Sequence, residues 1–162
     1  MTRSEPHRPA SWHPAHILAT WFGAGLFPKA PGTIGSLAAL PIAYLVSHHL
    51  GMIGLGVAII VLVAAGIWAA HVYSRRTASK DAGQIVIDEV AGQWLTLLLV
   101  PDDILFYAIG FALFRFADIV KPWPISWVDR NVKGGLGVML DDLLAGALAA
   151  ILLWIIWIMT GI

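Results

Sequence analysis

The chain has 162 residues, the size of one domain, so we expect a single domain over residues 1–162. Hydrophobic residues make up 59% and charged residues 12%, whereas soluble domains carry roughly 25% charged residues. This composition favours a chain embedded in a bilayer over a water-soluble one. The zero net charge gives no electrostatic basis for binding nucleic acid. The lack of cysteine excludes disulfides, thiolate metal sites and a cysteine nucleophile.

The amino-terminal segment is polar. Residues 1–15 contain several Pro and His and lack the apolar run of a cleaved signal peptide, so we expect this segment to be flexible. Residues 15–22, which include Trp21, have a mixed face that is typical of a segment lying in the membrane interface.

Apolar runs predict an all-α, polytopic membrane protein with about five helical segments. Residues 51–70 carry no charge over about twenty positions, which is enough for one full span. Residues 36–46 are shorter and contain Pro41, so a half-span and a tilted helix both remain open. The other predicted segments are residues 85–100, 104–120 and 143–159.

The ten Lys and Arg residues indicate an orientation. None lies in the connections at residues 48–51 and 101–103, so all ten fall on the opposite side of the membrane. Cytoplasmic loops carry the positive excess in membrane proteins. We therefore expect the amino terminus and every polar motif at the cytoplasmic end, and the carboxyl terminus on the other side.

Acidic residues stand at the ends of these apolar segments or inside them. Asp88 and Glu89 begin one segment, Asp118 lies within another, and Asp141 and Asp142 begin the last. A charge at membrane depth costs roughly 2.5–3.5 kcal/mol on insertion scales, so such residues usually pair or bind a ligand. Favourable interaction with the helix dipole is the alternative for each doublet. Hard oxygen ligands without cysteine favour Mg²⁺ or Ca²⁺ over zinc.

Basic residues accompany these acids. Arg115, Asp118 and Lys121 are spaced three residues apart and lie roughly along one helix face. Arg115 and Lys121 are candidates for binding phosphate, and Arg130 is a further candidate. The alternative is an internal salt bridge, with Lys121 reaching toward lipid headgroups.

A glycine-rich turn at residues 31–36 precedes an apolar segment. Its backbone N–H groups would form an anion site, to which Lys29 adds charge and Thr33 and Ser36 add hydroxyl donors. A helix cap with a tight turn is an equally good interpretation. No Asp-x-Asp motif is present, and the six histidines lie outside the polar motifs. The remaining chemistry is attack by water assisted by a metal ion that carboxylates hold.

Five motifs resemble the phosphatidylglycerophosphatase A family, a family of bacterial membrane lipid phosphatases, and cover most of residues 20–150. They are Gly23-x-Gly25-x-x-Pro28-x-Ala30-Pro31-Gly32-Thr33-x-Gly35-Ser36-Leu37; Asp88-Glu89-x-x-Gly92; Arg115-x-x-Asp118-x-x-Lys121-Pro122-x-Pro124; Asp129-Arg130; and Gly134-Gly135-x-Gly137-x-Met139-x-Asp141-Asp142. The resemblance implies hydrolysis of phosphatidylglycerophosphate to phosphatidylglycerol and inorganic phosphate. It also implies Mg²⁺, a largely helical fold and the bacterial cytoplasmic membrane.

On this interpretation Glu89, Asp141 and Asp142 hold Mg²⁺, and Asp88 and Asp118 are further ligands or hydrogen-bond to them. The substrate-binding candidates are Lys29, Thr33, Ser36, Arg115, Lys121 and Arg130. The expected partner is a phospholipid within the bilayer, and the sequence does not indicate an oligomeric state. A small transporter or ion-binding protein is one alternative, and a phosphatidyl-group transferase is another.

Overall fold

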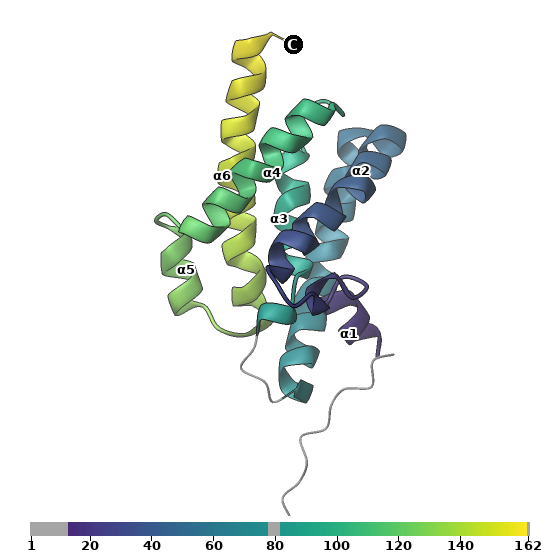
Figure 1. Cartoon of the computed structure of the whole chain (residues 1–162), viewed down its shortest axis with the longest axis vertical. Helices are drawn as coiled ribbons and strands as arrows, with labels where there is room; N and C mark the ends of the chain where they lie inside the picture. The colour runs from purple at the N-terminus through teal and green to yellow at the C-terminus, as the bar shows by residue number, and fades with distance from the viewer. Residues whose placement is uncertain (1–12, 78–81, 162) are drawn as a thin grey trace, which may run out of the picture.

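The computed structural model describes residues 13–77 and 82–161, and they form an all-α fold, as predicted (Figure 1). Most of the expected flexible segment at residues 1–15 lies outside the described residues. So do three of the cations used for the orientation, Arg3, Arg8 and Lys80. The α-helices are α1 (Pro14–Ala19), α2 (Pro31–Thr77), α3 (Ile87–Leu97), α4 (Ile104–Val120), α5 (Ile125–Asn131) and α6 (Gly134–Thr160), and the 3₁₀ helices are η1 (Ala24–Leu26) and η2 (Ala82–Gln84).

Two helices are long and apolar enough to cross a membrane, at Pro31–Arg75 in α2 and Gly134–Thr160 in α6. Large apolar side chains point outward from both, among them Ile53 at 79% exposure and Met159 at 80%. A soluble fold of this size would bury such side chains, so this surface fits contact with lipid.

Helix α2 consists of two arms that meet at Gly51. That residue has φ 66° and ψ −173°, so residues 31–50 and 52–77 form separate helical stretches, which lie antiparallel in Figure 1. The first arm is about 30 Å long at 1.5 Å per residue, close to the thickness of the hydrocarbon core. The predicted segments 36–46 and 51–70 were therefore too short, because the first arm begins within the glycine-rich turn and the second continues to Thr77.

Helix α3 lies at the centre and packs against α2, α4 and α6. Its crossing with α6 is close because glycines face each other: a Cβ atom on Gly146 would collide with the Gly92 carbonyl. The Thr96 hydroxyl donates to the carbonyls of Gly92 (2.9 Å) and Gly146 (3.3 Å). The Trp94 indole N–H donates to the Ala39 carbonyl of α2 (3.0 Å). These bonds fix the position of α3 between its neighbours.

The boundaries of α4 agree with the prediction, whereas those of α6 do not. Asp103 caps α4 by accepting from the Leu105 N–H (2.7 Å), and the helix ends at Lys121, whose φ is 47°. Helix α6 begins at Gly134, so Asp141 and Asp142 lie about two turns inside it. The expectation that these acids begin a helix was wrong, and the helix dipole does not account for them because its effect is confined to the first turn.

Two short helices add to the predicted segments. Helix α1 overlaps the first part of the segment expected in the membrane interface, residues 15–22, and it buries Ala15 and Ala19. The Ala19 carbonyl accepts from the Val86 N–H (2.8 Å) and so holds α1 against the start of α3. Helix α5, which the sequence did not predict, packs against α6.

Candidate active site

The polar motifs meet at one end of the helix bundle (Figure 1). The first arm of α2, α3 and α6 begin there, and α4 ends there. This end contains a cavity of about 370 Å³. Among the described residues, its lining includes two cations, Lys121 and Lys133, and six carboxylates, from Asp88, Glu89, Asp118, Asp129, Asp141 and Asp142.

Three of the carboxylates form a tight cluster. Asp88, Glu89 and Asp142 each offer an oxygen atom within 4.8 Å of the other two, and they are the metal-competent group found among the described residues. Asp88 and Asp142 are buried. Asp88 Oδ1 accepts from the Glu89 N–H (3.1 Å). Glu89 Oε2 and Asp142 Oδ2 are buried without a hydrogen-bond partner in the described part of the chain.

The chemistry of this cluster fits a hard divalent cation. Like charges this close repel strongly in a buried site, and unpartnered carboxylate oxygens are costly there. A cation bound between the three side chains relieves both effects. Oxygen donors alone, without His or Cys, suit Mg²⁺ or Ca²⁺.

Gly32 and Gly92 bring the cluster together. A Cβ atom on Gly32 would collide with Glu89 Oε1, so the backbone of α2 lies directly against that carboxylate. A Cβ atom on Gly92 would lie 2.6 Å from the carbonyl oxygen of Asp142. Glycine at these two positions therefore allows α2 and α6 to approach α3 at the depth of the acids.

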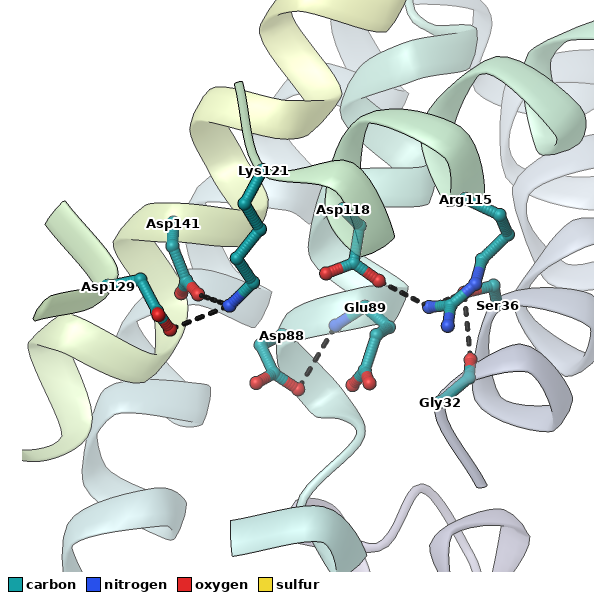
Figure 2. A network of polar contacts seen from close by, with 9 residues as sticks. All are labelled: Gly32, Ser36, Asp88, Glu89, Arg115, Asp118, Lys121, Asp129 and Asp141. Carbon is teal, nitrogen blue, oxygen red and sulfur yellow. Dashed lines mark hydrogen bonds and ion pairs between the residues drawn. The ribbon is translucent and has the colours of Figure 1, made fainter. Parts of the chain in front are cut away.

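Arg115 connects α4 to α2 beside the cluster (Figure 2). Its Nη1 lies 2.6 Å from Asp118 Oδ2 and donates to Ser36 Oγ (3.4 Å). The Ser36 hydroxyl donates in turn to the Gly32 carbonyl (2.9 Å). Arg115 and Asp118 are only 15% and 12% exposed, so this pair is shielded from solvent and holds the guanidinium group at a fixed position.

Lys121 forms a second ion-pair centre on the other side of the cavity (Figure 2). Its Nζ donates to Asp129 Oδ1 (2.7 Å) and Asp141 Oδ2 (2.6 Å). Burial lowers the pKa of Lys121, but the two hydrogen bonds outweigh that effect and raise it above its ordinary value. The hydrogen bond from Lys121 lowers the pKa of Asp129. The lysine is therefore charged, and Asp141 Oδ1 is left buried without a partner among the described residues.

The structure brings together most of the predicted site residues, but not all. The five acids and Lys121 line the cavity, Arg115 pairs with Asp118 of that lining, and Ser36 contacts Arg115. Lys29 and Arg130 are exposed, Thr33 is half-buried, and none of the three lines the cavity. Arg130 Nε instead donates to the Ser126 carbonyl within α5 (2.9 Å).

The three-carboxylate cluster contains some of the five acids predicted as metal ligands or their hydrogen-bond partners, and the other two acids pair with cations. Asp88 belongs to it, whereas Asp141 is paired with Lys121 and Asp118 with Arg115. Asp129 and Gly32 belong to the family motifs, but the sequence analysis did not predict either as a metal ligand or a substrate-binding residue. Asp129 comes shortly after Lys121, beyond a turn that contains Pro122 and Pro124. This closeness in sequence is the signal from which its ion pair with Lys121 could have been predicted.

A model of the family phosphatidylglycerophosphatase A matches residues 17–157. The chain belongs to this family. Phosphatidylglycerophosphatase A of Escherichia coli is 42% identical over 145 residues, which cover 89% of this chain and 84% of the relative. The Haemophilus influenzae protein of that name is 35% identical over 161 residues, covering 96% of this chain and 97% of the relative.

A relative from Bacteroides thetaiotaomicron carries the provisional name phosphatidylinositol-3-phosphatase. It is 40% identical over 151 residues, which cover 86% of this chain and 94% of the relative. No solved structure gives a significant match. The family match contains all of α2 to α5 and all but the end of α6, so every residue of the cavity falls within it.

Proposed function

We propose that this phosphatidylglycerophosphatase A family member hydrolyses the terminal phosphomonoester of phosphatidylglycerophosphate, using a Mg²⁺ ion held by Asp88, Glu89 and Asp142. The products are phosphatidylglycerol and inorganic phosphate. One observation carries the proposal: the family's motifs converge on a buried three-carboxylate cluster with a cation on either side.

The charge balance of the cavity supports a metal requirement. An anionic phosphomonoester would be repelled by the cavity lining, which among the described residues has six carboxylates and two lysines. When bound, Mg²⁺ supplies positive charge for the phosphoryl oxygens and lowers the pKa of a water molecule. The oxygen donors, two of them without partners, match its preferred ligands.

The cations would position the phosphate. Arg115 is held by Asp118 and Ser36, so its guanidinium group is fixed before the substrate arrives. A guanidinium group suits paired hydrogen bonds to phosphate oxygens, and Lys121 adds a point charge from the opposite side. Fixed cations of this kind stabilise charge that builds up on the transferring phosphoryl group.

Asp141 is our candidate for the general base. Lys121 holds its Oδ2 (2.6 Å), which fixes the position of the carboxylate, and its Oδ1 has no partner among the described residues. In the hydrolysis, a water oxygen forms a bond to phosphorus, and the bond between phosphorus and the glycerol oxygen breaks. The proton lost by water would pass to Asp141 Oδ1, and the departing glycerol oxygen takes up a proton.

The position of the cavity suits a lipid substrate. It lies at the ends of two helices that are long enough to cross a membrane, so a headgroup would reach it without leaving the bilayer. We place this end at the cytoplasmic face of the bacterial inner membrane, because the described Lys and Arg residues gather there. The buried acids and the cations that pair with them gather at this end, which also argues against a permeation path through the bundle.

The decisive test measures phosphate release from phosphatidylglycerophosphate by the purified protein in mixed micelles. We expect turnover with Mg²⁺, its loss with EDTA, and recovery when Mg²⁺ is added back. Absence of release under all three conditions would refute the activity. Release that EDTA does not affect would refute the metal requirement. Proteoliposome flux without phosphate release would favour a transporter instead.

Phosphatidylinositol 3-phosphate is the second candidate substrate because of the Bacteroides relative's name. It too carries a phosphomonoester on a polyol headgroup. The same assay with both lipids decides between them, since the ratio of their kcat/KM values measures the preference. We expect that ratio to favour phosphatidylglycerophosphate.

A further inference from the structure

A second hollow of about 970 Å³ lies between the first arm of α2 and α4. Its lining is apolar over most of its length, and two carboxylates stand at its far end, before α4 begins. We call it the α2–α4 groove. Its lining side chains include Leu37, Leu40 and Leu45 from α2, Ala108 and Phe111 from α4, and Asp102 at the far end.

The groove ends against the polar site. Leu37 directly follows Ser36 in the chain, and Phe111 lies one helical turn before Arg115. Arg115 donates to Ser36 Oγ (3.4 Å) and, on its other side, pairs with Asp118, which lines the carboxylate cavity. The Ser36–Arg115 contact is therefore the boundary between the apolar groove and the carboxylate cavity.

We propose that the α2–α4 groove binds one fatty acyl chain of the phospholipid whose phosphate occupies the carboxylate cavity. This inference rests on the proposed function. An apolar groove whose lining residue Phe111 lies one helical turn from the shielded guanidinium group of Arg115 is complementary to an anionic amphiphile. Residues 37–45 alone span about 12 Å of helix, which accommodates a substantial part of a chain.

The groove would act by orientation rather than by affinity. A bilayer is as apolar as the groove, so moving a chain from lipid into the groove yields little hydrophobic free energy. A chain held there would instead fix the glycerol backbone beside Ser36 and Arg115 and so fix the phosphate. Misplacement of a reacting group by about 1 Å can reduce turnover about 100-fold.

Crosslinking tests the occupant directly. The probe is a phosphonate analogue of phosphatidylglycerophosphate, which cannot be hydrolysed, with a diazirine midway along one acyl chain. It is added with Mg²⁺ to the full chain in vesicles. We expect labelling of residues 37–45 and 104–111 to exceed labelling of residues 53–61, where Ile53, Ile60 and Val61 are exposed. Phosphatidylcholine with the same diazirine should label both regions alike.

A substitution at Ala108 supplies a second, independent test of the groove. Ala108 is exposed and lines the groove, so Ala108→Phe narrows the groove without crowding the core. Ala64→Phe is the matched control, because Ala64 is exposed on the second arm of α2 and does not line the groove. We expect Ala108→Phe to reduce groove labelling and kcat/KM by about tenfold, and Ala64→Phe to change each by less than about twofold.

The outcomes separate the two proposals. If the unaltered protein releases no phosphate from phosphatidylglycerophosphate, the proposed function fails. If it does release phosphate, but the phosphonate probe labels the same residues as phosphatidylcholine does, the groove holds bulk lipid and the acyl-chain assignment is overturned. Equal effects of Ala108→Phe and Ala64→Phe would overturn it as well.

Discussion

Gly32 lies directly against the carboxylate of Glu89. A Cβ atom on residue 32 would collide with Glu89 Oε1 and would lie 3.3 Å from Arg115 Nη1. The glycine-rich turn therefore contributes more than a helix start. It lets the backbone of α2 touch both the carboxylate cluster and the fixed guanidinium group, so any side chain here must displace one of them.

Substitution of Gly32 tests this contact. Gly32→Ala should lower turnover of phosphatidylglycerophosphate by about 100-fold, because Glu89 and Arg115 must move. Gly56→Ala is the matched control in the same helix, since a Cβ atom there meets nothing closer than a Leu98 methyl carbon at 3.9 Å. Phosphate release gives the turnover. Equal activity of the two variants would contradict the role of Gly32.

Neutralising one acid of the cluster should abolish turnover without lowering the melting temperature of the metal-free protein. Asp142→Asn removes like-charge repulsion, so in EDTA we expect its melting temperature to equal or exceed that of the unaltered protein. Mg²⁺ at 100 times its dissociation constant should stabilise the unaltered protein by about 2.7 kcal/mol. The variant should lose this response together with its turnover. An unchanged Mg²⁺ response would remove Asp142 from the ligand set.

The two carboxylate partners of Lys121 differ in burial, which predicts unequal effects. Lys121→Gln leaves Asp141 without its cation, so turnover should fall about 100- to 1000-fold. Asp129→Asn should cost less than about tenfold, because Asp129 is 45% exposed and Lys121 keeps its bond to Asp141. Similar losses in both variants would mean that the lysine acts through Asp129.

The glycine contact between α3 and α6 should govern stability. Gly146→Ala would force a Cβ atom into the Gly92 carbonyl, and overpacking of this kind costs about 1–3 kcal/mol. Thermal unfolding in detergent should show a lower melting temperature than for Gly56→Ala. A melting temperature equal to that of Gly56→Ala would show that α3 and α6 can move apart at this contact without loss of stability.

Convergence of the acids at one end was predictable from the sequence. Asp88, Asp118 and Asp142 lie in separate apolar segments, and the connections without Lys or Arg at residues 48–51 and 101–103 indicated which segment ends lie together. The bounds of α4 were predictable too, because Asp103 gives a cap signal and Pro122 a stop signal.

Two features were not predictable from the sequence: where α6 begins, and which acids form the cluster rather than pair with a cation. Glycines at residues 134, 135 and 137 indicate a turn by propensity, yet packing holds them in a helix: a Cβ atom on Gly135 would lie 2.5 Å from the Ile67 carbonyl oxygen. The partners of Asp141 and Asp142 depend on the rotation of α6 about its axis. That rotation is set by contacts with α2 and α3 that sequence spacing does not encode.

The central claim is that Asp88, Glu89 and Asp142 share one divalent ion. Anomalous diffraction from crystals of the full chain grown with Mn²⁺, a hard ion that takes the same oxygen ligands as Mg²⁺, tests it most directly. We predict one strong peak in contact with carboxylate oxygens of all three residues. A peak that contacts at most one of them, or none at this end of the helices, would contradict the account.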